Sequence, residues 1–293
     1  MTSCRVLGAS GYTGAETLRW LLGHPEVEVV GATAGRRAGQ RLDAIWPAFR
    51  GHTDLVLTES APEADVTFLC LPHGEARSVA PGMGGVVIDL SADHRFEWAY
   101  GLPELGRVAK GASRVANPGC FATALALALL PLRGRLPERV HAVGLTGSTG
   151  SGATPSDTTH HPMRDENLRP YKVKHHQHAP EVEHALGGGF ALDFVPISAP
   201  LRRGILVTLD LGASVDDYLS FYDHNPLVRV LDRPPEVIEV LGSPRADIGV
   251  VEGVVFCAID NLSRGAGSQA VSNLNLAMGW PVDLGLRAIP PVP

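Results

Sequence analysis

Apolar residues in the first part of the chain gather in short runs that are separated by turn residues. The runs at 66–71 and 86–90 are almost unbroken. Such runs are typical of strands in a parallel sheet that is covered on both faces, because neither face meets water. Shorter strands are predicted at 6–9 and 27–33, with a helical pattern between them.

The second part of the chain mixes helical and strand patterns. Alternating Ala and Leu at 124–130 predict a buried helix. Ser214, followed by Asp216 and Asp217 in the first turn, predicts a capped helix at 214–222. Further strands are predicted at 140–145, 195–197, 202–211 and 250–259, and further helices at 179–186 and 269–278.

These patterns predict an α/β protein of two domains. The first is a Rossmann-type domain and the second an α+β domain with a mixed sheet. We expect 1–119 and 260–293 to form the Rossmann-type domain, and 120–259 to form the second. A length of 293 residues agrees with two domains, since single domains are usually shorter.

Composition narrows the function classes. Hydrophobic residues at 44% and charged residues at 19% are typical of a soluble globular protein, and a net charge of −6 gives no broad attraction to nucleic acid or to acidic membranes. The longest apolar runs, of about eight residues, are too short to span a bilayer, and the first residues lack a signal-peptide pattern. We expect a cytoplasmic protein.

A glycine-rich turn follows the first strand. Gly8, Gly11 and Gly14 form the pattern G-x-x-G-x-x-G, and Thr13 and Glu16 have the spacing of a capping box for the next helix. A strand, a glycine turn and a helix are the arrangement in which backbone approaches a pyrophosphate. The predicted cofactor contacts in this turn are Ser10, Gly11, Tyr12, Thr13 and Gly14.

The end of the second strand indicates which dinucleotide binds. An NAD site would place an acidic residue there, whereas this chain has Arg36 and Arg37, which suit the 2′-phosphate of NADP. A solvated basic loop is the alternative. Given the glycine turn, we predict NADP as the cofactor.

Polar residues follow the next two strands, where ligands of open parallel sheets bind. Pro72 and His73 end the strand at 66–71 and are predicted neighbours of the cofactor. Ser91, Asp93 and Arg95 end the next strand and are predicted to contact substrate, with Arg95 able to hold an anion. The alternative is that Asp93 and Arg95 are a surface loop pair.

Four cysteines are present, without the spacing of a metal site or a disulfide framework. Cys4, Cys70 and Cys257 lie in apolar runs and are expected to be core residues. Cys120 differs, because Asn117-Pro118-Gly119 delivers it to the start of a helix. A helix N-terminus favours the thiolate, the form that attacks acyl carbons.

Candidate partners of Cys120 occur further along the chain. The loop at 146–152, which includes Ser148, either cradles a phosphate or is simply flexible. Five histidines lie between residues 160 and 178. They could bind zinc, be solvated loop residues, or supply one acid–base partner of Cys120. Arg203 is either an exposed edge charge or part of an anion clamp.

With these residues in place, the chain resembles the N-acetyl-γ-glutamyl-phosphate reductases and their lysine-pathway relatives, which reduce an aminoadipyl phosphate, often attached to a small carrier protein. The most specific stretch is 117–123. The resemblance also rests on 8–14, 68–74, 89–96, 100–104, 115–131, 166–173, 176–181, 203–205 and 260–276. His94 departs from a usual Phe, and Lys174 with His175 replaces the usual glycines.

The resemblance implies a role for each candidate residue. Cys120 would be the nucleophile and His176 its acid–base partner, with no metal. Asn261 and Gly265 would lie near the nicotinamide, and the predicted substrate contacts include Asn117, Ser148, His178 and Arg203. The second domain would be catalytic and would mediate dimerisation or higher self-association.

The predicted reaction is NADPH-dependent reduction of an acyl phosphate to a semialdehyde through a cysteine thioester. N-acetyl-γ-glutamyl phosphate of arginine biosynthesis is the expected substrate, and a carrier-linked aminoadipyl or glutamyl phosphate of lysine biosynthesis is the alternative. More distant alternatives are a non-enzymatic NADP-binding regulator, a cysteine hydrolase and an aspartate-semialdehyde-type dehydrogenase. The hydrolase would leave the glycine turn and Arg36–Arg37 unexplained.

Overall fold

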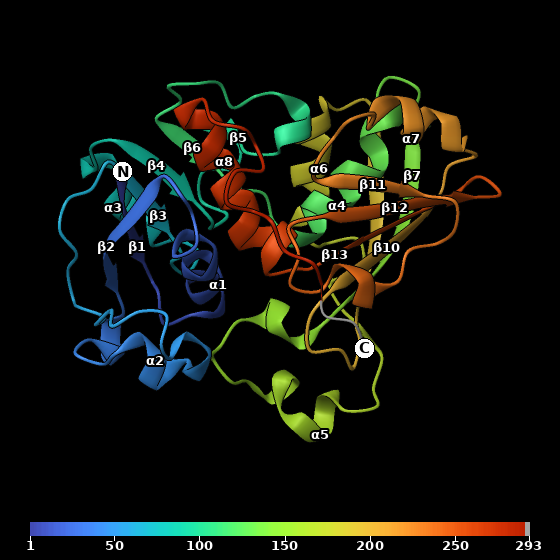
Figure 1. The fold of residues 1–293 in the computed structure, drawn as a ribbon. Coiled ribbons are helices and arrows are strands. Elements are labelled where there is room, and N and C mark those ends of the chain that lie inside the picture. Colours follow the sequence, from blue (N-terminus) through green and yellow to red (C-terminus); the bar gives the residue numbers. More distant parts are fainter. Residues whose placement is uncertain (291–293) are drawn as a thin grey trace. The chain divides into compact units, whose positions relative to one another are not determined.

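Two units make up residues 1–290, which are the residues that the structure, a computed structural model, describes. The first contains Met1–Gly119 and Ala266–Arg287, and the second contains Cys120–Gly265 with residues 288–290. Among residues 1–290, no helix has the length and apolar character needed to cross a lipid bilayer. Each unit has its own sheet (Figure 1).

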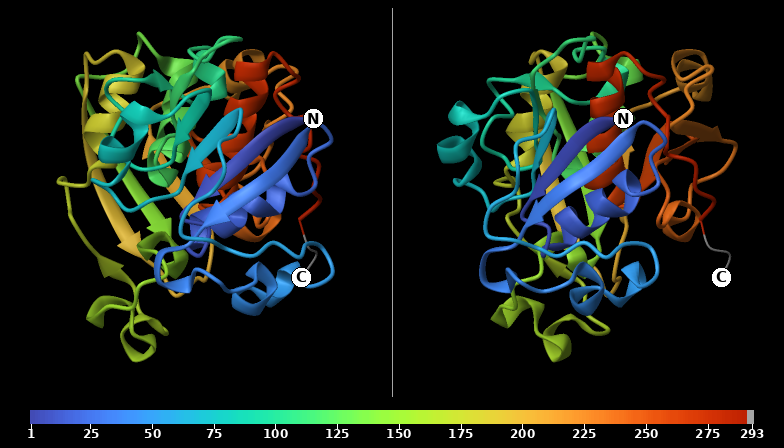
Figure 2. Two further views of the ribbon diagram at one scale, coloured as in Figure 1. Left: turned by 90° about the vertical axis from the view of Figure 1, so that its left-hand side faces the viewer. Right: turned by 60° about the vertical axis from the view of Figure 1, so that its left-hand side comes forward.

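The sheet of the first unit is entirely parallel, with the order β2-β1-β3-β4-β6-β5. Its strands are β1 (Thr2–Leu7), β2 (Val27–Thr33), β3 (Val66–Leu69), β4 (Val86–Asp89), β5 (Ala99–Tyr100) and β6 (Arg114–Ala116). Figure 2 shows β1 and β2 side by side. All four residues of β3 are buried, as expected for a strand covered on both faces.

Helices complete the first unit. They are α1 (Tyr12–Leu21), α2 (Leu42–Ile45), α3 (Ala76–Val79) and α8 (Ser268–Met278). Although α8 comes from the end of the chain, it packs against α1 and β4. The chain runs from β1 to β2 on one side and from β3 onward on the other, so the topological switch point lies between β1 and β3.

The sheet of the second unit is mixed, with the order β11-β12-β13-β10-β7-β9-β8. Its strands are β7 (Arg139–Thr146), β8 (Arg169–Pro170), β9 (Ala191–Ser198), β10 (Ile205–Asp210), β11 (Val228–Leu231), β12 (Ala246–Val251) and β13 (Val254–Ile259). The pairs β7–β9 and β11–β12 are parallel, and the other pairs are antiparallel.

One face of this mixed sheet is covered and the other is open. The helices of the second unit are α4 (Cys120–Leu129), α5 (His161–Arg164), α6 (His178–Leu186) and α7 (Val215–Phe221). Helix α4 packs on β10 and β13, and α6 packs on β9. Along β7, buried Val140 and Ala142 alternate with exposed His141 and Val143, so the second face meets solvent.

The predicted fold class is confirmed, because a parallel sheet and a mixed sheet are both present. The capped helix at 214–222 is also confirmed: Ser214 accepts from the backbone N–H of Asp216 at 3.3 Å.

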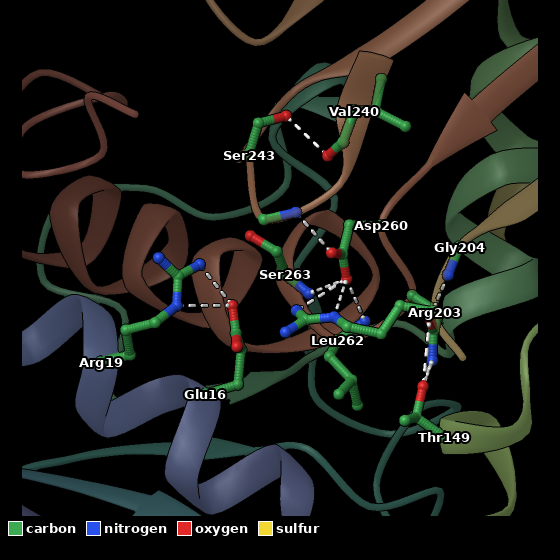
Figure 3. A network of polar contacts seen from close by, with 12 residues as sticks. Glu16, Arg19, Thr149, Arg203, Gly204, Val240, Ser243, Asp260, Leu262 and Ser263 are labelled. Carbon is green, nitrogen blue, oxygen red and sulfur yellow. Dashed lines mark hydrogen bonds and ion pairs between the residues drawn. The ribbon is translucent and has the colours of Figure 1, made fainter. Parts of the chain in front are cut away.

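The predicted capping box at Thr13 and Glu16 is wrong. Helix α1 begins at Tyr12, with Gly11 rather than Thr13 as its N-cap and no side-chain capping bond. Glu16 instead accepts hydrogen bonds within the helix, from Arg19 Nε at 3.1 Å (Figure 3) and from the indole N–H of Trp20 at 3.2 Å. A cation three residues along the helix is the stronger partner for this carboxylate.

Candidate active site

The three glycines of the first turn have different physical requirements. Gly8 has φ +88° and packs directly on the carbonyl of Cys70, so a side chain there is excluded. A Cβ on Gly14 would lie 2.7 Å from the Cα of Ala9, so only glycine lets α1 pack against this turn. A Cβ on Gly11 would meet only the Gly8 oxygen, at an ordinary 3.6 Å.

The N-terminus of α1 is prepared for an anion. No side chain caps it, and Gly11 adds no bulk there, so the first backbone N–H groups face no side-chain acceptor. A helix N-terminus of this kind binds pyrophosphate. Of the other predicted contacts in the turn, Ser10 precedes the N-cap, Tyr12 is the first helical residue with its ring 5.6 Å from that of Trp46, and Thr13 follows it.

Arg36 and Arg37 occupy a short 3₁₀ turn, Gly35–Arg37, directly after β2. Both side chains are exposed, and within residues 1–290 neither forms an ion pair with a carboxylate. Two unneutralised guanidinium groups at the end of the second strand fit the 2′-phosphate of NADP.

The predicted residues after β3 and β4 contact one another. Asp93 accepts from the backbone N–H of Gly74 at 2.7 Å, and His73 Nδ1 accepts from the N–H of Ala92 at 3.0 Å. Ser91 donates its hydroxyl to Asp89 at 2.9 Å. Pro72 precedes His73 in the same connection. These bonds hold the two strand ends together at the carboxyl edge of the sheet.

Arg95 and Asn117 are also joined. The buried Arg95 donates Nε to the carbonyl of Asn117 at 3.2 Å, while the Asn117 side chain accepts from Asn273 at 2.9 Å and donates to the Ala266 carbonyl at 3.3 Å. The side chains of Arg95, Asn117 and Asn273 therefore fix the backbone just before Cys120. Among residues 1–290, no hydrogen bond joins Asp93 to Arg95.

In the second unit, Cys120 is the first residue of α4 and is the only residue of this helix that is not fully buried. Its position at the positive end of a ten-residue helix favours the thiolate. Gly265 packs against it: a Cβ on Gly265 would lie 2.7 Å from the Cβ of Cys120. Gly265 belongs to a π-helical turn, Ser263–Gly267, a feature common at functional sites.

The other cysteines have different surroundings. Cys4 and Cys257 are fully buried, and burial raises the pKa of both Cys4 and Cys70 to about 12. A thiol with such a pKa stays protonated at neutral pH. Cys120 is the cysteine placed for nucleophilic chemistry.

His176 lies in an aromatic box in the second unit. Its ring meets those of Phe121, Tyr171 and Phe194 edge-on, at centroid distances of 5.7, 5.7 and 5.6 Å. Gly144 on β7 makes room for the box, because a Cβ there would lie 2.6 Å from the Phe121 ring. The box fixes the orientation of the imidazole.

A backbone bond fixes the tautomer of His176. Its Nδ1 accepts from the N–H of His178 at 3.2 Å, so the neutral ring carries its proton on Nε2. Burial, and secondarily the positive charge of Lys172, lower the pKa of His176 to about 4. At neutral pH the ring is therefore an uncharged hydrogen-bond donor from Nε2.

Tyr171 connects this box with Cys120. Burial raises the pKa of Tyr171 to about 12, and the negative charge of the Cys120 sulfur adds to the rise. The phenol, the sulfur and the imidazole thus belong to one site in the second unit. Sequence reasoning missed Tyr171, because a single tyrosine in a loop gives no signal of what it will contact.

The remaining histidines of the dense segment divide by burial. His176 and His178 are buried, with their rings 4.6 Å apart, whereas His160, His161 and His175 are exposed. Among residues 1–290, no three His, Cys, Asp or Glu side chains gather in a metal-binding arrangement. His160, His161 and His175 are therefore solvated loop residues, which is one of the three alternatives for this segment.

The loop that contains Ser148 is held by the neighbouring segment. The backbone N–H groups of Ser148 and Thr149 donate to the carbonyls of Leu201 and Arg202 at 2.7 and 3.1 Å. Since these two N–H groups are engaged, a phosphate could be held here only by other groups of the loop, such as the hydroxyls. Gly147 permits the close approach, because a Cβ there would lie 2.7 Å from Arg203 N.

Figure 3 shows the polar network around the buried Asp260. Its carboxylate accepts from Arg203 Nη2 at 2.9 Å and from the backbone N–H groups of Gly242, Leu262 and Ser263. Asn261 accepts from Gly204 N–H at 2.7 Å and donates to Thr149 at 3.0 Å. Arg203 and Asn261 thus anchor the turn that leads to Gly265.

Comparisons with known proteins match the two parts of the chain to two different family models. Residues 4–111 match the family described as "Semialdehyde dehydrogenase, NAD binding domain", and residues 120–261 match "Semialdehyde dehydrogenase, dimerisation domain". The N-acetyl-gamma-glutamyl-phosphate reductase of Xanthomonas campestris is 37% identical over 95% of this chain and 96% of its own length.

Two further relatives bear on function and fold. The [LysW]-L-2-aminoadipate 6-phosphate reductase of Deinococcus radiodurans is 38% identical over 96% of this chain and 95% of its own length. The solved aspartate semialdehyde dehydrogenase II of Vibrio cholerae covers 94% of this chain and 98% of its own, with a TM-score of 0.76 at 15% identity. At that identity it supports the fold alone.

The glycine turn predicts that two similar substitutions act differently. Gly14→Ala forces a Cβ into the turn and should destabilise the protein by about 1–3 kcal/mol. Gly11→Ala places its Cβ in ordinary contact at an N-cap and should cost about 1 kcal/mol or less, yet should weaken NADPH binding at least about tenfold by keeping the backbone from the pyrophosphate. Thermal unfolding and fluorescence titration with NADPH measure the two effects. Unchanged NADPH affinity in Gly11→Ala would contradict the assignment.

The tautomer of His176 predicts which substitution is tolerated. Gln places an N–H group near the position of Nε2, whereas Asn places one near Nδ1. His176→Asn should therefore lose about 10²–10³-fold in kcat, the cost of a lost oxyanion donor, and His176→Gln should lose clearly less. Equal losses in the two variants would contradict donation from Nε2.

The lowered pKa of His176 predicts a pH dependence that NMR of the imidazole can follow. The ring should stay neutral as the pH falls through 6.5 and should protonate only near 4. Because the unfolded chain takes up this proton near pH 6.5, stability should fall as the pH drops from 6.5 toward 4. Titration of the His176 ring near 6.5 would overturn the assignment.

Proposed function

The chain belongs to the N-acetyl-γ-glutamyl-phosphate reductase family of semialdehyde dehydrogenases, and we propose that it reduces an acyl phosphate to an aldehyde through a thioester on Cys120. The predicted family and enzyme class are confirmed by these relatives, so a non-enzymatic regulator is set aside. The observation that carries the proposal is Cys120 at the half-buried start of an otherwise buried helix, whose next residue, Phe121, packs edge-on against the imidazole of His176.

Cys120 begins the reaction. Its thiolate attacks the acyl carbon, a C–S bond forms, and the C–O bond to phosphate breaks, so that inorganic phosphate leaves. The N-terminus of α4 stabilises the thiolate before attack and again when the aldehyde departs. Gly265 fixes the position of the sulfur from behind, since no larger residue fits against the Cys120 Cβ.

The nucleotide site fits NADP on three observations in the first unit. The N-terminus of α1 has no side-chain cap, Gly11 adds no side chain there, and Arg36 and Arg37 form no ion pair within residues 1–290. Gly11 to Gly14 would hold the pyrophosphate and the two arginines the 2′-phosphate, with Pro72 and His73 beside them. When bound, NADPH supplies the hydride that converts the thioester into a thiohemiacetal.

His176 acts on the oxygen of the substrate. Both tetrahedral intermediates carry negative charge on that oxygen, and Nε2–H is the group that can donate to it. Because its pKa is about 4, the ring donates a hydrogen bond and stays neutral, and the oxyanion can then collapse to release the aldehyde. His178 supports this geometry through its backbone N–H.

We propose N-acetyl-γ-glutamyl phosphate as the substrate and N-acetylglutamate 5-semialdehyde as the product, an arginine-biosynthesis step in the cytoplasm. The support is the identity to reductases of that name. A carrier-linked aminoadipyl phosphate is the second candidate, because the Deinococcus relative is equally similar. In that case a small carrier protein would be a partner.

We further propose that the chain forms a homo-oligomer through its second unit. The support is the match of residues 120–261 to a dimerisation domain, together with the open face of the mixed sheet. On that face Val143 is 40% exposed, which is unusual for a central strand residue and fits a surface that a second copy covers.

The reverse reaction tests the proposed function. N-acetylglutamate 5-semialdehyde should reduce NADP only when inorganic phosphate is present, since phosphate releases the acyl group from Cys120. Absorbance at the NADPH band measures the rate. Turnover that does not need phosphate would contradict the proposal, and silence with this aldehyde but activity with a carrier-linked one would select the second substrate.

Cys120→Ser is the matched control. It should bind NADPH within about twofold of the wild type and lose nearly all turnover, because a serine hydroxyl is a far weaker nucleophile at neutral pH. Cys70→Ser removes a thiol whose pKa is raised to about 12, and it should retain activity.

A further inference from the structure

Arg164 in the second unit is a buried cation whose charge no carboxylate offsets. It ends α5, and its side chain is only 8% exposed. Nη2 makes one long hydrogen bond, 3.4 Å to the carbonyl of Ala199, and Nε has no hydrogen-bond partner within residues 1–290. Guanidinium cannot lose its proton in a protein, so burial without a counter-charge is costly.

A second arginine, Arg169, lies beside the same end of β9. Arg169 is in β8 and pairs in register with Ser198 at the end of β9, next to the Ala199 carbonyl that Arg164 contacts. Neither arginine has a carboxylate partner in the described part of the chain. Both residues thus lie beside the end of β9, and burial, and secondarily the positive charge of Arg169, lower the pKa of Arg164.

Arg164 is buried and Arg169 is half-buried, and among residues 1–290 no carboxylate forms an ion pair with either of them. Asp165, the residue after Arg164, is 61% exposed and lies 3.8 Å from His161 instead. A solvated surface charge, the usual explanation of an unpaired arginine, does not apply to a side chain with this burial. The missing anion must therefore come from a ligand.

The arginine pair belongs to the same site as Cys120. The chain passes from Arg169 through Pro170 to Tyr171, and the charges of the Cys120 sulfur and of both guanidinium groups contribute to the pKa of its phenol. Tyr171 is in turn edge-on to His176. An anion held by the pair would thus be part of the molecule that reacts at Cys120.

We propose that Arg164 and Arg169 bind the carboxylate at the non-reacting end of the acyl substrate. This inference rests on the proposed function. The reacting end already meets the N-terminus of α4 at Cys120, so the second anion site serves the opposite end. The planar fork of an arginine matches a carboxylate in a bidentate manner.

Both candidate substrates carry the group that the arginine pair would bind. N-acetylglutamyl and aminoadipyl phosphates both retain an α-carboxylate and differ in what the amino group carries and in one methylene. The arginine pair would bind the α-carboxylate that both substrates share. Choice between them would then depend on other residues.

The reverse reaction separates the possible anions, because aldehyde, phosphate and NADP are added as different molecules. Arg169→Gln should raise the KM for N-acetylglutamate 5-semialdehyde about tenfold to one-hundredfold, the usual cost of a charge-assisted hydrogen bond, and leave the KM values for phosphate and NADP within about twofold. Arg169→Lys should fall between, since it keeps the charge and loses the fork.

Two controls distinguish binding from folding. Arg164→Met should raise the same KM while its melting temperature stays equal or increases, because it removes an uncompensated buried charge. Arg135→Gln removes an exposed arginine of the same unit, paired with Asp217, and should leave every KM unchanged. An aldehyde with the α-carboxylate blocked as an amide should be used equally well by the wild type and by Arg169→Gln.

The outcomes are distinct. A KM for the aldehyde that does not change in Arg169→Gln overturns the carboxylate site while leaving the proposed function standing. A rise confined to phosphate or to NADP also overturns it and assigns the pair to that anion. A wild-type enzyme that uses no semialdehyde bearing an α-carboxylate overturns both proposals.

Discussion

The chemistry of this chain depends on one sulfur at the positive end of a buried helix. Helix α4 is buried from Phe121 to Leu129, so it cannot shift without disrupting the core of the second unit. That rigidity fixes Cys120 at the first turn, where the helix dipole favours the thiolate. The absence of a side chain at Gly265 and the aromatic box around His176 are then constraints on what can surround this sulfur.

Anions are expected wherever this protein leaves positive groups without partners. In the first unit these are the uncapped N-terminus of α1 and the exposed Arg36 and Arg37. In the second unit they are the buried Arg164 and its neighbour Arg169. Of these groups, the buried Arg164 costs stability in the free protein, and a bound carboxylate would offset that cost. The contrast is Arg203, whose charge is matched by the buried Asp260.

Sequence patterns predicted the features that local physics determines. Nearly unbroken apolar runs predicted the parallel strands, and a Pro-Gly turn before an Ala/Leu run predicted Cys120 at the start of α4. The capping box failed because Glu16 has a stronger partner in Arg19 on the same helix. Long-range features gave no signal. Arg164 is followed by Asp165 and Glu166 and looks like an ordinary solvated charge, and the proton position on His176 depends on a backbone N–H that only the folded turn supplies.

The thioester on Cys120 is the central claim, and a single-turnover experiment without phosphate tests it most directly. When the enzyme is mixed with the semialdehyde and NADP alone, hydride transfer should produce one equivalent of NADPH per chain and then stop, because the acyl group stays on the sulfur. Intact-mass measurement should find the acyl group on the peptide that contains Cys120, and adding phosphate should release it. Absence of the burst and of the adduct, in an enzyme that turns over when phosphate is present, would contradict the account.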